Sequence, residues 1–257
     1  MREHINVVKI GGAVLESDTD REKFLRRFAS LPSPKVLIHG GGRTATKVAE
    51  SMGIESHFIN GRRVTSPDMR DVAVMVYAGL VNKNVVAALN ADGCRAIGLT
   101  GADAFTVMSV RRSSEPVDYG EVGDVKSVDA DGVASLISAG FTPVFCAITA
   151  SAEGNLLNTN ADTVATEIAC ALASRYDVSL TMAFEKDGVM SDVDNPDSVI
   201  TEISCESFTR LKDEGIVNGG MIPKIENALM AVGRGVKEVV IQNYSALGDS
   251  TGTRICL

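Results

Sequence analysis

The stretch VVKIGGAVLE, residues 7–16, decides the fold class of this chain. Its first half is rich in β-branched residues and predicts a buried strand, and the glycines after Lys9 predict a tight turn. Ligands of open parallel sheets bind at the carboxyl ends of strands, where glycines let the backbone approach phosphate oxygens. We therefore expect Lys9, Gly11 and Gly12 to face a phosphorylated ligand, although a plain turn with a surface lysine explains the stretch equally well.

A second turn of the same kind follows in VLIHGGGRTATKVAE, residues 36–50. A strand that ends at His39 leads through Gly40, Gly41 and Gly42 into a helix, and such a run of backbone N–H groups can hold an anion. The spacing matches neither GxGxxG nor GxxxxGK[ST], so neither a dinucleotide-binding fold nor a P-loop is predicted. A strand-to-helix turn without a ligand is the alternative, and we expect His39 to be structural rather than a base.

Composition limits the possible partners. The 257 residues are 45% hydrophobic and 23% charged, as in soluble globular proteins, and the net charge is -8 with a pI near 5.0. An acidic chain of this kind is not expected to bind nucleic acid. The longest uncharged run, residues 72–81, is too short to span a bilayer, and the N-terminus has no signal-like pattern. We therefore expect a cytoplasmic protein without a membrane partner.

Strand-like and helix-like segments alternate along the chain, which predicts an α/β protein: a three-layer αβα sandwich around a central, mainly parallel open sheet. We expect two lobes that share this sheet, residues 1–174 and 175–257. Residues 104–128 predict an antiparallel excursion, and TPVFCAITA, residues 142–150, predicts a single buried strand. The other predicted elements are strands at Ile5–Ile10, Val36–His39, Val178–Phe184 and Glu238–Ile241 and helices at Asp20–Ser30, Thr44–Met52, Ser66–Asn90, Asp131–Ala139, Ser207–Glu214 and Ile222–Gly233.

A pair of arginines follows the expected turn at Asn60-Gly61. The guanidinium groups of Arg62 and Arg63 suit a carboxylate, because each can donate two parallel hydrogen bonds to it. A solvated surface pair is the alternative interpretation.

Two later motifs head helices. In NTNAD, residues 158–162, Asn160 can cap the helix and Asp162 can complement its dipole, which is also the purely structural interpretation. In VNGGMIPK, residues 217–224, glycines again precede a helix whose first turns carry Lys224. This second motif predicts phosphate binding.

Taken in order, the motifs KIGG, HGGG, GRRVT, NTNAD, GGMIPK and the terminal GTRI resemble the amino-acid kinase superfamily and, within it, the acetylglutamate kinases. The resemblance runs from Val7 to Leu257. It implies an N-terminal lobe that binds the acyl amino acid and forms a homodimer, and a C-terminal lobe that binds ATP. It also implies phosphorylation of the side-chain carboxylate of an N-acyl-L-glutamate, such as N-acetylglutamate, in arginine biosynthesis.

The resemblance implies a role for each candidate residue. Lys9 and Lys224 correspond to the lysines that stabilise the transferring phosphoryl group, and Asp162 to the aspartate that holds both. The other correspondences are Gly41, Gly42, Arg63 and Asn158 on the acyl substrate and Gly11, Gly12, Val217, Asn218 and Met221 on the nucleotide. ATP would bring Mg2+, held mainly by its own phosphates, and no metal site of the protein is implied.

The chemistry of carboxylate phosphorylation fits these roles. A glutamate side chain has a pKa near ~4.3, so the nucleophile is already ionised at neutral pH and needs no general base. The obstacle is repulsion between this carboxylate and the anionic phosphates, roughly 4 kcal/mol for a pair about 4 Å apart at an effective dielectric near 20. Two lysines would offset the repulsion where charge spreads over the transferring group.

Two segments depart from the resembled family. TMAFEKDGVM, residues 181–190, is longer than the usual turn, and we expect its Lys186 to lie near a phosphate or the ribose of ATP. Arg111 and Arg112 add positive charge to the expected hairpin, which suggests N-succinylglutamate as an alternative substrate; a solvated hairpin is the other interpretation. Because no segment precedes the first strand, we expect a homodimer that arginine does not inhibit, with the helix Ser66–Asn90 as its interface.

Other functions stay open at this point. Carbamate kinase, aspartokinase, glutamate 5-kinase and nucleoside monophosphate kinases share the resembled fold, although Arg63 and the NTNAD spacing favour an acylated glutamate. A non-catalytic sensor of amino acids or nucleotides would not need Lys9 and Lys224 together with Asp162. A nicotinamide dehydrogenase is disfavoured, because its fingerprint glycines are absent from the sequence.

Overall fold

One eight-stranded sheet organises the protein, in a computed structural model that describes residues 2–59, 61–192 and 194–257. In spatial order its strands are β12 (Glu202–Ile203), β14 (Thr253–Ile255), β13 (Glu238–Asn243), β11 (Asp177–Phe184), β1 (His4–Ile10), β2 (Lys35–His39), β8 (Thr142–Cys146) and β5 (Ala96–Leu99). Neighbouring strands run parallel except β13 and β14, which are antiparallel. The predicted mainly parallel sheet is therefore confirmed.

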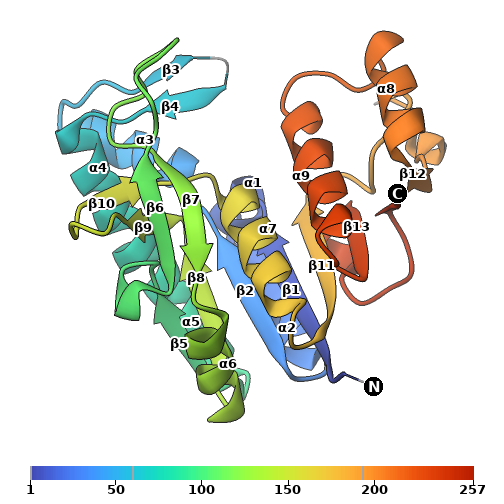
Figure 1. Cartoon of the computed structure of the whole chain (residues 1–257), viewed down its shortest axis with the longest axis horizontal. Helices are drawn as coiled ribbons and strands as arrows, with labels where there is room; N and C mark the ends of the chain where they lie inside the picture. Colours follow the sequence, from blue (N-terminus) through green and yellow to red (C-terminus); the bar gives the residue numbers. More distant parts are fainter. Residues whose placement is uncertain (1, 60, 193) are drawn as a thin grey trace.

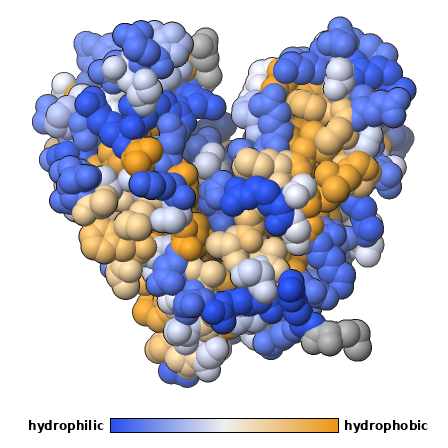
Figure 2. All heavy atoms as spheres, in the orientation of Figure 1, coloured by the Kyte–Doolittle hydropathy of each residue, from blue (hydrophilic) through white to orange (hydrophobic). Residues whose placement is uncertain are grey.

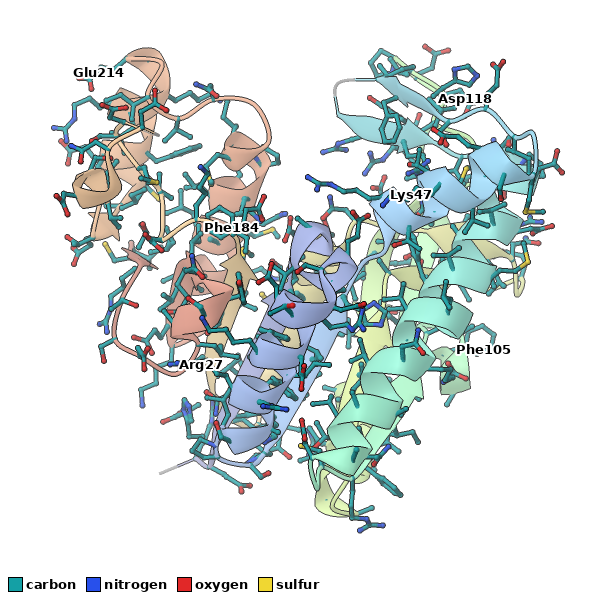
Figure 3. The ribbon with its side chains drawn as sticks, turned by 180° about the vertical axis from the view of Figure 1, so that it is seen from behind. Arg27, Lys47, Phe105, Asp118, Phe184 and Glu214 are labelled. Carbon is teal, nitrogen blue, oxygen red and sulfur yellow. The ribbon has the colours of Figure 1, made fainter. Side chains whose placement is uncertain are left out.

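Helices cover both faces of the sheet, so the predicted three-layer sandwich is also confirmed (Figure 1). The face seen in Figure 1 carries α6 (Ala130–Ser138), α7 (Ala161–Leu172) and α9 (Met221–Gly233). The opposite face, seen from behind in Figure 3, carries α2 (Asp18–Ser30) and α5 (Asn82–Ala91).

The first strand, β1, shows how the sequence sorts side chains to the two faces. Ile5 and Val7 are buried with the core on the α7 side, whereas Val8 and Ile10 are buried with the core on the α2 side. Side chains alternate along a strand, so Lys9 shares the face of Ile5 and Val7 and points toward α7. A strand that is apolar on both faces is typical of a covered parallel sheet.

The predicted antiparallel excursion is present as a smaller sheet. Its strands are β10 (Leu156–Asn158), β9 (Ile148–Ala150), β6 (Val107–Arg111) and β7 (Gly123–Val128), and β6 and β7 are antiparallel. The prediction of one strand over residues 142–150 is wrong, because the chain leaves the main sheet after Cys146 and enters the smaller sheet as β9. Both strands are buried, so an uninterrupted apolar run carried no sign of the break.

A short antiparallel hairpin also belongs to the N-terminal part of the chain. It consists of β3 (His57–Ile59) and β4 (Arg62–Val64). The turn expected between them includes Asn60, which lies outside the described residues.

The predicted long helix begins at Pro67 and ends at Ala91, and the Ser66 side chain caps it by accepting a hydrogen bond from the amide of Met69. It comprises α4 (Pro67–Val74), a π-helical segment η1 (Met75–Val81) and α5. By length and composition the helix could cross a membrane, a test that core helices of globular proteins also pass. Its inward face packs on α3 (Gly42–Ser51) and on β5 and β8, as expected for a core helix.

A deep notch divides the molecule into two lobes (Figure 2). Asp118, on the N-terminal side, and Glu214, after α8 (Cys205–Asp213), mark their far tips in Figure 3. The helix α7 lies between the lobes in Figure 1. The predicted boundary after residue 174 falls between α7 and β11, and this boundary stays a prediction.

His39 is structural, as expected. It is fully buried at the end of β2, where its Nδ1 donates to the carbonyl of Gly40 over 2.7 Å and its Nε2 accepts from the Asn82 amide over 3.0 Å. Both ring nitrogens are thus satisfied by a neutral imidazole. Burial lowers the pKa of His39 to about 4.

The stability of the protein should therefore fall as the pH falls from about 6.5 toward 4. In this window the unfolded chain protonates its histidine while folded His39 stays neutral, so protons favour unfolding. The lost free energy of unfolding should approach about 3 kcal/mol, at 1.36 kcal/mol per pKa unit. Urea unfolding of wild type and His39→Gln across this window measures the effect, and equal pH slopes for the two proteins would contradict it.

Candidate active site

Three charged side chains from distant parts of the chain meet in the structure. Lys9, near the end of β1, places its Nζ 2.8 Å from Oδ1 of Asp162 in the first turn of α7. Lys224, in the first turn of α9, places its Nζ 3.4 Å from both carboxylate oxygens. The predicted pairing of both lysines with one aspartate is therefore present. Asn160 caps α7 through the amides of Asp162 and Thr163, as predicted, and so fixes where the carboxylate lies.

Burial makes this cluster electrostatically strong. Burial alone would raise the pKa of Asp162, but the ammonium groups of Lys9 and Lys224 outweigh it and hold the pKa well below its usual range. Burial and the nearby Lys9 lower the pKa of Lys224, and Asp162 opposes that shift. The carboxylate balances only one of the two cations, so the cluster carries net positive charge that can attract an anion.

An aromatic ring supports the second lysine. The ammonium of Lys224 lies 5.6 Å from the centre of the Phe184 ring, a cation–π contact. Phe184 ends β11 and lies beside the junction of the lobes in Figure 3. The two lysines thus lie at the carboxyl ends of the central strands, beside the notch between the lobes.

A cavity of about 360 Å³ lies on the N-terminal side and contains all four residues predicted to hold the acyl substrate. Arg63 is buried, and its guanidinium donates to the carbonyl of Gly42 (2.7 Å) and to the hydroxyls of Thr46 (2.7 Å) and Ser56 (2.8 Å). No carboxylate pairs with it among the residues that the structure describes. A fixed guanidinium without a counter-ion is suited to bind a carboxylate.

The other predicted residues of this cavity, which we call the acyl pocket, also have defined roles. Asn158 is buried and donates to the hydroxyl of Thr65 over 3.0 Å. Gly41 must be glycine, because a Cβ there would lie 2.7 Å from Cδ1 of Tyr77. Gly42 begins α3, where backbone N–H groups have no partner within the helix.

The predicted nucleotide-side glycines differ from each other. The amide of Gly11 donates to the carbonyl of Ala183 over 2.9 Å, which extends the ladder between β1 and β11 by one residue. That amide is therefore not free to bind a phosphate, while the placement of Gly11 beside the nucleotide stays a prediction. Gly12 begins α1 (Gly12–Glu16), and a side chain there would meet open space.

The remaining nucleotide residues do not all present their side chains. Lys186 and Asn218 are exposed, and Met221 is half-buried as the first residue of α9. Val217 is 1% exposed within the hydrophobic core, so its side chain is not available to a ligand. The side chain of Val217 therefore serves packing, and its position beside the nucleotide stays a prediction.

Arg62, which the sequence offered with Arg63 as a carboxylate ligand, also lines the acyl pocket. Two further lining residues, Arg43 and Tyr77, were not predicted from the sequence. Arg43 directly follows the HGGG turn, and this position could have indicated its role. No sequence signal indicated Tyr77, because the direction of its side chain depends on an irregularity in the long helix.

The two hairpin arginines lie apart. Arg112 lines the acyl pocket, but its guanidinium is paired with Asp124 (Nε to Oδ1, 3.0 Å). Arg111 lines a different cavity, with Glu121 among its neighbours. Only one of the pair can therefore influence an acyl group.

Taken together, these features define a class of protein: an α/β protein in which a lysine–aspartate–lysine cluster adjoins a pocket lined by arginines. The chain belongs to the amino acid kinase family, whose sequence profile matches residues 4–243.

Proteins named acetylglutamate kinase are similar to this chain over almost its whole length. The one from Bacteroides thetaiotaomicron is 50% identical, over 99% of this chain and 99% of its own. The one from Parabacteroides distasonis is 48% identical, over 98% and 99%. Among solved structures, smu.665 from Streptococcus mutans gives a TM-score of 0.84 at 29% identity, with 99% of each chain covered.

An Asp162→Asn variant should lower the pKa of Lys224 further, because it removes the charge that opposes burial and Lys9. A lower pKa leaves more neutral amine, so Lys224 should react several-fold faster with acetic anhydride at neutral pH, as mass spectrometry can measure. Asp177→Asn, which frees the exposed Lys237, is the matched control and should leave Lys224 unchanged. An unchanged or slower reaction of Lys224 in Asp162→Asn would contradict the electrostatic assignment.

Proposed function

We propose that this chain is an ATP-dependent N-acetylglutamate kinase of arginine biosynthesis. It transfers the γ-phosphoryl group of ATP to the side-chain carboxylate of N-acetyl-L-glutamate and gives an acyl phosphate and ADP. The observation that carries the proposal is the largely buried Lys9–Asp162–Lys224 cluster beside a pocket whose Arg63 has no counter-ion among the described residues. The names of relatives at 48–50% identity over nearly the full chain support the same substrate.

The mechanism follows from electrostatics. The ionised side-chain carboxylate of the substrate attacks the γ-phosphorus, and the bond to the bridging oxygen breaks with its electron pair leaving on ADP. Lys9 and Lys224 stabilise negative charge on the transferring group, and Asp162 keeps both ammonium groups close together. Arg63 holds the other carboxylate of the substrate, which fixes the direction of attack. No general base is needed, because the nucleophile carries no proton at neutral pH.

The nucleotide side is assigned by proposal as well. We place Lys186, Asn218 and Met221 on ATP in a C-terminal lobe of residues 175–257. Gly12, at the start of α1 in the acyl-binding lobe of residues 1–174, faces the phosphates from the other side. No group of three or more His, Cys, Asp or Glu side chains could hold a metal ion within the described parts of the chain. We therefore propose that Mg2+ enters with the nucleotide, where it offsets the charge of the phosphate oxygens.

N-succinylglutamate is the second candidate substrate. It rests on Arg112, which lines the acyl pocket. Because Asp124 already neutralises that guanidinium, an additional carboxylate gains little from it. We therefore favour N-acetylglutamate and use the succinyl compound as the comparison.

Purified protein should release ADP from ATP when N-acetylglutamate is present, and more slowly with N-succinylglutamate. Lys9→Ala and Lys224→Ala should each lower kcat by about 100- to 1000-fold, the usual effect of removing one stabilising group from a transition state. Lys237→Ala, at an exposed lysine paired with Asp177, is the control and should keep wild-type activity. A protein that binds both ligands without releasing ADP would instead be a sensor.

We also propose a cytoplasmic homodimer that joins two copies through the long helix. Met75 and Leu80 on that helix are each 51% exposed, which is unusual for such large apolar side chains. Wild type should sediment with twice the mass of one chain. Met75→Lys combined with Leu80→Lys should give monomers, whereas Met230→Lys, at an exposed methionine of α9, should not. A wild-type mass of one chain would refute the dimer.

A further inference from the structure

The long helix is irregular where it passes the acyl pocket. Met75–Val81 is π-helical, and such insertions often occur at functional sites because they redirect neighbouring side chains. On a regular α-helix, residues four apart share a face, yet Val76 is buried and Leu80 is 51% exposed. Tyr77 and Asn82, which are five residues apart, are instead both buried, and Asn82 is only 1% exposed. Five residues on a regular α-helix differ in direction by about 140°. The π-helical turn is therefore what lets Tyr77 and Asn82 both point inward.

The two inward side chains do different things. Asn82 serves the core, because its amide donates to His39 and to the carbonyl of Val144. Tyr77 instead lines the acyl pocket, with its ring against the backbone of Gly41. The π-helical turn thus places the phenol side chain of Tyr77 in the proposed substrate site.

The hydroxyl of Tyr77 lies close to the guanidinium of Arg63. A Cβ built on Gly42 would be 3.7 Å from the Tyr77 hydroxyl and 3.9 Å from Nη2 of Arg63, so both groups flank the same piece of backbone. Arg63 can donate hydrogen bonds but cannot accept them. The hydroxyl oxygen can therefore only accept from Arg63, which acts on it as a hydrogen-bond donor. No hydrogen bond donated by this hydroxyl is found within the described residues, so its proton is available to a ligand.

The phenol stays protonated under ordinary conditions. Burial raises the pKa of Tyr77, against the smaller opposing effect of the Arg63 guanidinium. A neutral donor beside a fixed cation suits a carboxylate, which can accept from both at once.

We propose that Tyr77 is a substrate-binding residue that donates its hydroxyl proton to the same carboxylate that pairs with Arg63. This inference rests on the proposed function, in which that carboxylate is the α-carboxylate of N-acetylglutamate. Arg63 supplies the charge, and Tyr77 supplies a directional contact that selects one orientation of the amino acid. The side-chain carboxylate is then left to reach the Lys9–Asp162–Lys224 cluster.

Tyr77→Phe tests the inference, because it keeps the ring against Gly41 and removes only the hydroxyl. The KM for N-acetylglutamate should rise roughly ten- to a hundredfold, as for the loss of a hydrogen bond to a charged group. The kcat and the KM for ATP should change less than about threefold, because the contact is made in the ground state and the transition state alike. Tyr176→Phe, at a buried tyrosine just before β11, is the matched control and should behave as wild type.

A substrate analogue identifies the partner of the hydroxyl. When the α-carboxylate is replaced by a carboxamide, the penalty of Tyr77→Phe should shrink several-fold, because a hydrogen bond to a neutral carbonyl is weaker. An unchanged KM in Tyr77→Phe, or an equal penalty with both substrates, overturns the inference while the proposed function stands. A wild type that releases no ADP overturns the proposed function and this inference together.

Discussion

The structure depends on one buried carboxylate shared by two ammonium groups. Removing charged side chains from water costs several kcal/mol for each ion unless they pair closely, and Asp162 supplies that pairing for both Lys9 and Lys224. Without it, two like charges would face each other in a poorly solvated site. Because one carboxylate faces two ammonium groups, one positive charge is left unbalanced. A transferring phosphoryl group is the kind of anionic ligand that can neutralise this charge.

The sheet explains how such a cluster forms from residues so far apart in the chain. β1 pairs with β11 in parallel register, with Lys9 opposite Met182 and Ile10 opposite Ala183, so their carboxyl ends lie at one edge. α7 runs along β1 and β11 on one face of the sheet and presents its first turn to that edge (Figure 1). The cluster is therefore a consequence of strand order and helix direction. No flexible loop has to be held in place for it to exist.

The glycines of the two turns differ in what their small size permits. A Cβ on Gly11 would lie 3.4 Å from the Cβ of Phe184, an ordinary contact, so packing against β11 does not by itself require a glycine there. A Cβ on Gly41 would lie 2.7 Å from Cδ1 of Tyr77, so this glycine makes room for the Tyr77 ring. The sequence reveals that a small residue is needed at such positions, but not whether the neighbour is a ligand or another part of the protein.

Sequence reasoning succeeded where the signal is local. Apolar runs located the central strands, and Ser66 and Asn160 located helix starts through their caps. It failed where tertiary contacts decide. The antiparallel pairing of β14 with β13, the burial of Val217 and the π-helical turn depend on packing partners that are distant in the chain. Arg111 and Arg112 line different cavities, which fits the rule that neighbouring residues of an extended strand point to opposite faces.

The chain as a whole is negatively charged, whereas its acyl pocket is lined by positive charges. The net charge is -8, yet the acyl pocket includes Arg43, Arg62, Arg63 and Arg112 and no Asp or Glu among its described lining residues. At physiological salt, exposed charges more than about 8 Å away are largely screened, so the local cations determine what the pocket attracts. A small dianion can therefore gain from the local field of these arginines even though the chain as a whole is acidic.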